Sequence, residues 1–124
     1  DLHSFPTRRS SDLEPAYQAC VIGAQRLRET RVLKLWRDQS GIEFPSFYLE
    51  LTVINSLIGI YGSLSKNVFA VFRYLADGFL DSRVTDPANT NNVISDDLTV
   101  REKSIIARHA KTALSAKNWD EIIR

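Results

Sequence analysis

The sequence predicts an all-α domain, a helical bundle of about five helices. Apolar residues recur at the three- and four-residue spacing of a helix face along most of residues 14–124. The connections between these stretches are short, and no stretch has the convincing alternation of a half-buried strand. The chain has 124 residues, of which 44% are hydrophobic and 25% charged, a composition typical of one ordinary globular domain.

The first thirteen residues are expected to lie outside this domain. Residues 1–13 show neither helical nor strand periodicity and have the character of a disordered leader. Residues 3–13, which read His-Ser-Phe-Pro-Thr-Arg-Arg-Ser-Ser-Asp-Leu, resemble the translation of a sequencing-library adapter. We therefore interpret residues 1–13 as a non-native leader, and residue 14 as a cut into a longer protein.

Two helices are predicted in the first half of the domain. Helix-forming residues dominate from Pro15 to about Gln39, and Ser40-Gly41 supplies a stop signal. Pro45 presets the backbone for a second helix over about residues 46–61, in which hardly any face is polar. A helix that is apolar on nearly every side belongs at the centre of a bundle.

A third helix and a loop follow. Apolar residues at helical spacing predict a helix that starts after Ser65 and ends near Gly78. Gly62-Ser63 is interpreted as the turn that ends the preceding helix. Residues 82–97 are rich in Asp, Asn and Thr, whose side chains bond to nearby backbone groups, so we expect an ordered loop there.

Two more helices complete the predicted bundle. Thr99 and Glu102 have the spacing of a capping box, which predicts a fourth helix that reaches about Ala116. Asn118 is expected to cap a last, short helix that carries Trp119, Ile122 and Ile123.

Bulk properties exclude several classes of function. The net charge of +1 is too small to indicate nucleic acid or an anionic membrane as a partner. Cys20 is the only cysteine, which excludes an intrachain disulfide and a cysteine-based zinc site and favours a reducing, cytoplasmic location. No apolar run reaches the roughly 18 residues that a bilayer span needs, so no membrane segment is predicted.

Lys34 and Ser46 form the first candidate site. Lys34 lies in an apolar Val-Leu-Lys-Leu-Trp helix, where an ammonium group requires an anion. Ser46 opens the next helix, where free backbone N–H groups and the helix dipole favour negative charge, so the pair suits a phosphate. From the residues alone, Lys34 can equally extend to solvent along its aliphatic stem while Ser46 caps the helix and Phe47 joins the core. Glu50 is expected to pair with a nearby Arg or to cap buried donors.

These two segments resemble the C-terminal lobe of the oligoadenylate synthetase and cyclic GMP-AMP synthase superfamily. A Leu-Lys-x-Trp helix at residues 33–36 precedes Pro-Ser-aromatic-x-Leu-Glu at residues 45–50. Bacterial members of the superfamily make cyclic oligonucleotides in anti-phage defence. The resemblance implies that Lys34 and Ser46 contact the triphosphate of a donor nucleotide and that Phe47 stacks on a base. Phe47 replaces the usual Tyr and lacks its hydroxyl.

A second motif adds to this resemblance. Residues 86–93 read Asp-Pro-Ala-Asn-Thr-Asn-Asn-Val and are similar to a loop of bacterial cyclic-oligonucleotide synthases and of archaeal-type CCA-adding enzymes. The whole resemblance covers about residues 16–124. The structural alternative for Asp86 and Asn92 is a self-capped turn that docks the last helices on the bundle.

The resemblance implies that residues 14–124 are one lobe of a larger α+β nucleotidyltransferase. The superfamily's catalytic carboxylates hold Mg²⁺ in an N-terminal half, and residues 14–124 contain no Gly-Ser…Asp-x-Asp arrangement. The fragment is therefore expected to bind nucleoside triphosphates, to pack against the missing half, and to be inactive alone. Two alternatives stay open: a lobe of a CCA-adding tRNA nucleotidyltransferase, and a non-catalytic helical interaction module.

Overall fold

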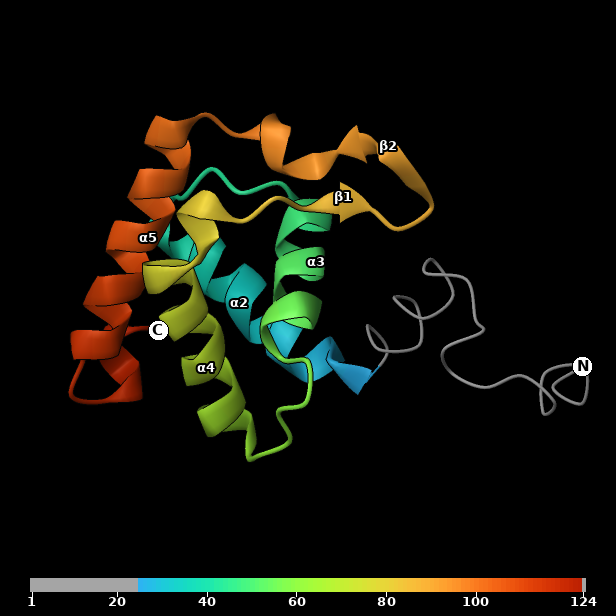
Figure 1. The fold of residues 1–124 in the computed structure, drawn as a ribbon. Coiled ribbons are helices and arrows are strands. Elements are labelled where there is room, and N and C mark those ends of the chain that lie inside the picture. The colour runs from blue at the N-terminus through green and yellow to red at the C-terminus, as the bar shows by residue number, and fades with distance from the viewer. Residues whose placement is uncertain (1–24, 124) are drawn as a thin grey trace, which may run out of the picture.

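The computed structural model describes residues 25–123, which form a helical bundle with a small antiparallel hairpin at one end (Figure 1). The predicted predominance of helix is confirmed, although these residues hold four α-helices rather than about five. The predicted leader, Cys20 and the predicted helix start at Pro15 lie outside the described residues. The helices are α2 (Leu27–Ser40), α3 (Ser46–Ser56), α4 (Leu64–Asp77) and α5 (Val100–Ser115).

Helix α2 ends where the sequence predicts. Gly41 follows its last residue with a left-handed φ of 65°, a conformation that costs glycine little. The Gly41 and Ile42 N–H groups donate to the carbonyls of Asp38 and Arg37, so the last turn of the helix is closed. The turn reverses the chain toward α3, which begins at Ser46 after Pro45 as predicted.

Helix α3 is shorter than the sequence predicts, because it ends at Ser56 and not near residue 61. Gly59 takes a left-handed φ of 76°, which a continuing helix does not allow. The Arg26 side chain donates to the carbonyls of Leu57 and Ile60, so these groups need no further helical turn. A side chain from α2's N-terminal cap position thus terminates a helix whose apolar pattern continues.

The interpretation of Gly62-Ser63 as the end of the preceding helix is wrong. Ser63 is the N-cap of α4, and its Oγ accepts from the Lys66 N–H at 3.2 Å. Helix α4 consequently starts at Leu64, slightly earlier than predicted. It ends at Asp77 before Gly78, in agreement with the predicted stop.

The capping box at the start of α5 is confirmed. The Thr99 Oγ1 accepts from the Glu102 N–H at 3.1 Å, and the Glu102 carboxylate accepts from the Thr99 N–H at 2.8 Å. The predicted last helix is instead a short 3-10 turn, η5 (Trp119–Glu121). Asn118 occupies its cap position without a side-chain hydrogen bond.

The expectation of no strand is also corrected, because the predicted loop contains a β-hairpin. Strand β1 (Thr85–Asp86) pairs antiparallel with β2 (Asn89–Val93), between the 3-10 turns η3 (Phe79–Asp81) and η4 (Ile94–Asp97). Most of β2 is exposed on both faces, so it has no buried side and no alternating apolar pattern. Periodicity therefore could not reveal this strand.

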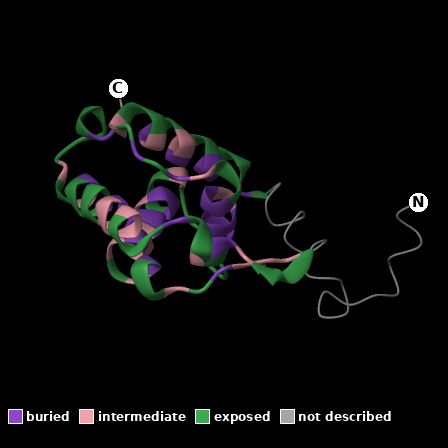
Figure 2. Cartoon of the chain, turned by 90° about the horizontal axis from the view of Figure 1, so that it is seen from above, coloured by how far each residue is buried: buried purple, intermediate pink, exposed green. Residues whose placement is uncertain are grey.

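The core lies between the four helices, where buried residues line their inner faces (Figure 2). Aromatic rings fill much of it: Trp36 meets Phe72 edge to face with ring centroids 5.0 Å apart. Phe44, Tyr48 and Phe79 form a second group with centroids 5.3 to 5.4 Å apart. The Tyr48 hydroxyl is buried and has no hydrogen-bond partner among the described residues.

Candidate functional site

Four polar side chains meet along the contact between α2 and α3, and we call this set the α2–α3 seam: Lys34, Arg37, Ser46 and Glu50. The Lys34 Nζ donates to the Glu50 Oε2 at 2.6 Å. The Arg37 Nη1 donates to the Ser46 Oγ at 2.9 Å. Lys34 and Arg37 lie about one turn apart on α2, as do Ser46 and Glu50 on α3. Lys34 and Ser46, the two predicted phosphate ligands, therefore lie on neighbouring turns of α2 and α3 along the seam.

The core residues of α2 determine where Lys34 lies. Leu33 and Trp36 are buried and face the bundle, whereas Leu35 is exposed. Lys34 comes between these two sides at the edge of the core, with 34% of its side chain exposed. Its ammonium reaches Glu50 from there, so the required anion is supplied by a carboxylate of the chain itself. Glu50 thus pairs with a lysine and not with the expected arginine.

Arg37 also fixes the chain that leads into α3. Its Nη1 donates to the Phe44 carbonyl at 3.0 Å as well as to Ser46, and its Nε donates to the Asp38 Oδ1 at 2.8 Å. One guanidinium therefore holds the end of α2, the connecting segment and the first residue of α3. Sequence reasoning missed Arg37, although its spacing from Lys34 placed both cations on the same side of α2.

The Ser46 hydroxyl does not cap α3. Helix α3 has no side-chain cap, and the Ser46 Oγ instead accepts from Arg37. A hydroxyl that accepts one bond keeps its own hydrogen for donation. The first N–H groups of an α-helix also lack partners within the helix. Ser46 can consequently donate to a phosphate oxygen from the end of α3 where the helix dipole is positive.

The two aromatic residues after Ser46 have different environments. Phe47 is 46% exposed, while Tyr48 is completely buried in the core. Only Phe47 therefore has a ring face available for stacking on a ligand. The seam as a whole is close to neutral, because the carboxylates of Glu50 and Asp38 balance its two cations.

The second sequence motif forms the turn of the hairpin. The Asp86 Oδ1 accepts from the Ala88 N–H at 2.8 Å, and the Asn89 Oδ1 accepts from the Asn91 N–H at 3.2 Å. These are self-capped turns, as the structural alternative for Asp86 states. Asn92 is exposed on β2. The hairpin and the start of α3 lie at the same end of the bundle (Figure 1).

A different polar group, the buried polar cluster, consists of Arg26, Glu29 and Asn67. All three residues are at least nine-tenths buried. The Arg26 Nη1 lies 3.6 Å from the Glu29 Oε2, and the Asn67 Nδ2 donates to the same oxygen at 2.9 Å. The cluster joins the first turn of α2 to the first turn of α4.

The buried polar cluster also holds the connection between α3 and α4. The Asn67 side chain accepts from the Gly62 N–H at 3.0 Å and donates to the Gly62 carbonyl at 3.2 Å. The Arg26 guanidinium donates to the carbonyls of Leu57 and Ile60, and it lies 4.9 Å from the centre of the Tyr61 ring. These contacts are directed at the chain's own backbone, so the cluster organises the fold.

Comparison of the chain with protein-family models, with curated proteins and with solved structures finds no match. Within residues 25–123, no three side chains of His, Cys, Asp or Glu gather in a way that could hold a metal ion. No helix in this part of the chain combines the length and the apolar character needed to cross a membrane.

Proposed function

We propose that this chain is the donor-nucleotide-binding lobe of a template-independent nucleotidyltransferase that makes cyclic di- or oligonucleotide second messengers in anti-phage defence. In this proposal Lys34 and Ser46 contact the donor's triphosphate, and Phe47 stacks on its base. The observation that carries the proposal is the α2–α3 seam, where Lys34 and Ser46 occupy adjacent turns with accessible polar atoms. The sequence resemblance supplies the class of ligand.

Two features of the seam support this proposal. Lys34 and Glu50 keep 34% and 41% of their side chains exposed, so an incoming phosphate can replace the carboxylate at the ammonium. Exposed ion pairs of this kind contribute only about 0 to 1 kcal/mol, so the exchange costs little. Arg37 holds the Ser46 oxygen and thereby leaves the hydroxyl hydrogen for the ligand.

The proposal assigns catalysis to a separate N-terminal half of the parent enzyme. Phosphoryl transfer needs carboxylate-bound Mg²⁺ to neutralise the developing charge, and the proposal places those carboxylates in that half. The described residues contribute binding and orientation of the donor. The partner of the lobe is then its own catalytic half, and the lobe alone is expected to bind nucleotide without turnover.

The test is a titration of the ¹⁵N-labelled chain with ATP, GTP and inorganic triphosphate, followed by amide chemical shifts. Saturable shifts are expected at residues 34, 46 and 47. Lys34→Ala should weaken triphosphate binding by about tenfold, equivalent to about 1.4 kcal/mol, because it removes one charge-assisted contact. Phe47→Ala should weaken nucleotide binding but leave inorganic triphosphate unaffected, because only the base stacks on the ring.

The matched control is Lys111→Ala, which removes an exposed lysine from α5. It should leave both affinities unchanged. Nucleotide shifts that avoid the seam, or equal losses of affinity in Lys34→Ala and Lys111→Ala, would contradict the assignment of the site.

A further inference from the structure

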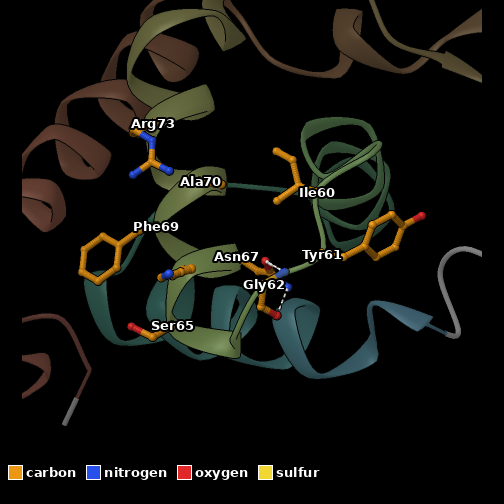
Figure 3. Close-up of a pocket in the computed structure, with 9 residues that line it drawn as sticks. Ile60, Tyr61, Gly62, Ser65, Asn67, Phe69, Ala70 and Arg73 are labelled. Atoms are coloured by element: carbon orange, nitrogen blue, oxygen red, sulfur yellow. Dashed lines mark hydrogen bonds between the residues drawn. The ribbon is translucent and has the colours of Figure 1, made fainter.

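A concavity of about 660 Å³ lies between residues 60–62 and residues 65–73 of α4 (Figure 3). Its size is within the range of small-molecule sites. Figure 3 shows Arg73 and Ile60 on either side of Ala70, whose small side chain leaves the space between them open. Neither the seam residues nor the hairpin contribute to its lining.

The concavity carries an unbalanced positive charge. Lys66 and Arg73 line it, both are exposed, and among the described residues no carboxylate lies within ion-pair distance of either. They are seven residues apart on α4, which is about two helical turns, so they share one face. No acidic residue lines the concavity. Two unpaired cations on one wall of a hollow favour a ligand with two negative charges.

The opposite wall is held in place before any ligand arrives. The Asn67 side chain accepts from the Gly62 N–H, donates to the Gly62 carbonyl and also donates to Glu29. These hydrogen bonds attach the segment that carries Ile60 to α4. The Arg26 guanidinium holds the Ile60 carbonyl from the other side. A preformed wall reduces the entropy that binding has to overcome.

The lining divides into a polar part and an apolar part. Ser65, Lys66 and Arg73 offer hydroxyl, ammonium and guanidinium donors, and a guanidinium fork matches two phosphate oxygens at once. Ile60, Phe69 and Ala70 offer an apolar surface beside these donors. A ligand that uses both parts has a doubly charged head and an apolar or planar body.

We propose that this concavity binds an organic phosphate, with the phosphate held by Lys66 and Arg73 and the organic group placed against Ile60 and Phe69. The site is separate from the seam, and the inference does not rest on the proposed function. It assigns a second candidate ligand site to the same chain.

The test uses phenyl phosphate and inorganic phosphate as probes on the ¹⁵N-labelled full chain. Phenyl phosphate should cause saturable shifts at the amides of Gly62, Lys66 and Arg73. It should also change the fluorescence of Trp119, whose ring centroid lies 5.1 Å from that of Phe69. It should bind more tightly than inorganic phosphate by about tenfold, the effect of burying roughly 50 to 60 Å² of apolar surface at about 25 cal/mol per Å².

Matched variants separate this site from the seam. Lys66→Ala and Arg73→Ala should each weaken the binding of phenyl phosphate by about tenfold, because each loses a charge-assisted contact. Arg101→Ala, which removes an exposed arginine from the first turn of α5, should have no effect. Lys34→Ala should also have no effect here, so the two sites can fail independently.

Three results would overturn the inference. The amide shifts at residues 62–73 could fail to saturate, or Arg73→Ala and Arg101→Ala could lose equal affinity for phenyl phosphate. The third is that phenyl phosphate and inorganic phosphate bind with equal affinity. Unchanged amide spectra of the ligand-free variants will show that each remains folded; Lys66, Arg73 and Arg101 are exposed, and Lys34 is half-buried.

Discussion

Helix α2 brings a cation to a carboxylate at its N-terminal end and again at its middle, but in opposite environments. At the N-terminal end, Arg26 and Glu29 are 5% and 6% exposed. At mid-helix, Lys34 and its partner Glu50 keep about a third or more of their side chains in solvent. The first pair belongs to the buried polar cluster and the second to the α2–α3 seam. The buried Arg26–Glu29 pair therefore stabilises the fold, whereas the Lys34–Glu50 pair is accessible to a ligand.

The difference is also visible in the partners of each group. Arg26 and Asn67 both donate to backbone carbonyls of the connection between α3 and α4. Lys34 has one partner, which is itself accessible, and Ser46 retains a hydroxyl hydrogen. A charge buried without its partner is expensive, whereas an exposed pair can exchange partners. The degree of burial therefore distinguishes the structural Arg26–Glu29 pair from the candidate binding pair of Lys34 and Glu50.

The largest expected effect is that of Glu29→Ala. Removing the carboxylate leaves Arg26 charged and buried, which should lower the free energy of unfolding by about 3 to 5 kcal/mol. Urea denaturation followed by circular dichroism measures this. Glu29→Gln is the control, because its amide oxygen can still accept from Asn67. Its free energy of unfolding should fall clearly less than that of Glu29→Ala. A loss below about 1 kcal/mol in Glu29→Ala, the magnitude of an exposed pair, would remove the contrast between the two ion pairs of α2.

The second effect concerns a buried polar group that has no partner among the described residues. Burial raises the pKa of the Tyr48 hydroxyl to about 12, with smaller contributions from Tyr74 and from the carboxylates of Asp97 and Asp96. The unfolded chain loses this proton near pH 10, before the folded chain does, so stability falls as the pH rises from 10 to 12. The loss attributable to Tyr48 is about 2 to 3 kcal/mol, at about 1.4 kcal/mol per pKa unit.

Tyr48→Phe isolates this contribution from the other groups that titrate at high pH. The difference in unfolding free energy between the two proteins should change in favour of the variant between pH 10 and 12. At pH 7 the replacement should not destabilise the protein, because the hydroxyl has no hydrogen bond to lose within residues 25–123. A parallel fall in both proteins would show that Tyr48 ionises normally.

The smallest effect is expected at the seam itself. A double-mutant cycle with Lys34→Ala and Glu50→Ala should give a coupling energy of about 0.2 to 1 kcal/mol that decreases with added salt. Chemical denaturation at low and high ionic strength measures it. A coupling above about 2 kcal/mol that is insensitive to salt would mean that Lys34 and Glu50 act as a buried structural pair. The seam would then be a poor site for exchange with phosphate.

Features with local causes could be predicted from the sequence. Gly41 stops α2, Thr99 and Glu102 start α5, and Gly78 follows the end of α4, because each signal acts within a few residues of itself. The early end of α3 has a distant cause, since Arg26 lies 31 residues before the Leu57 carbonyl that it binds. No window of sequence shows that contact.

The candidate site was predictable to a similar degree. An apolar helix around Lys34 indicated that an anion must be near, and the position of Ser46 at a helix start indicated where a phosphate would be favoured. The identity of the internal anion, Glu50, depends on how α2 and α3 pack against each other. Arg37 was missed because its importance comes from contacts with Phe44 and Ser46 across the turn. The nucleotide-binding roles of Lys34, Ser46 and Phe47 stay predictions.

The hold of Arg26 on the Leu57 and Ile60 carbonyls has a consequence for local unfolding. The end of α3 and the segment that follows it rely on a side chain from α2's N-terminal cap position, not on a further helical turn. If that turn opens, both carbonyls lose the guanidinium donor at once. The Leu57 carbonyl then keeps only the Ile60 N–H, and Asn67 still holds Gly62. Amide hydrogen exchange in the first turn of α2 and in residues 57–62 should therefore follow one common opening rate, as a single cooperative unit.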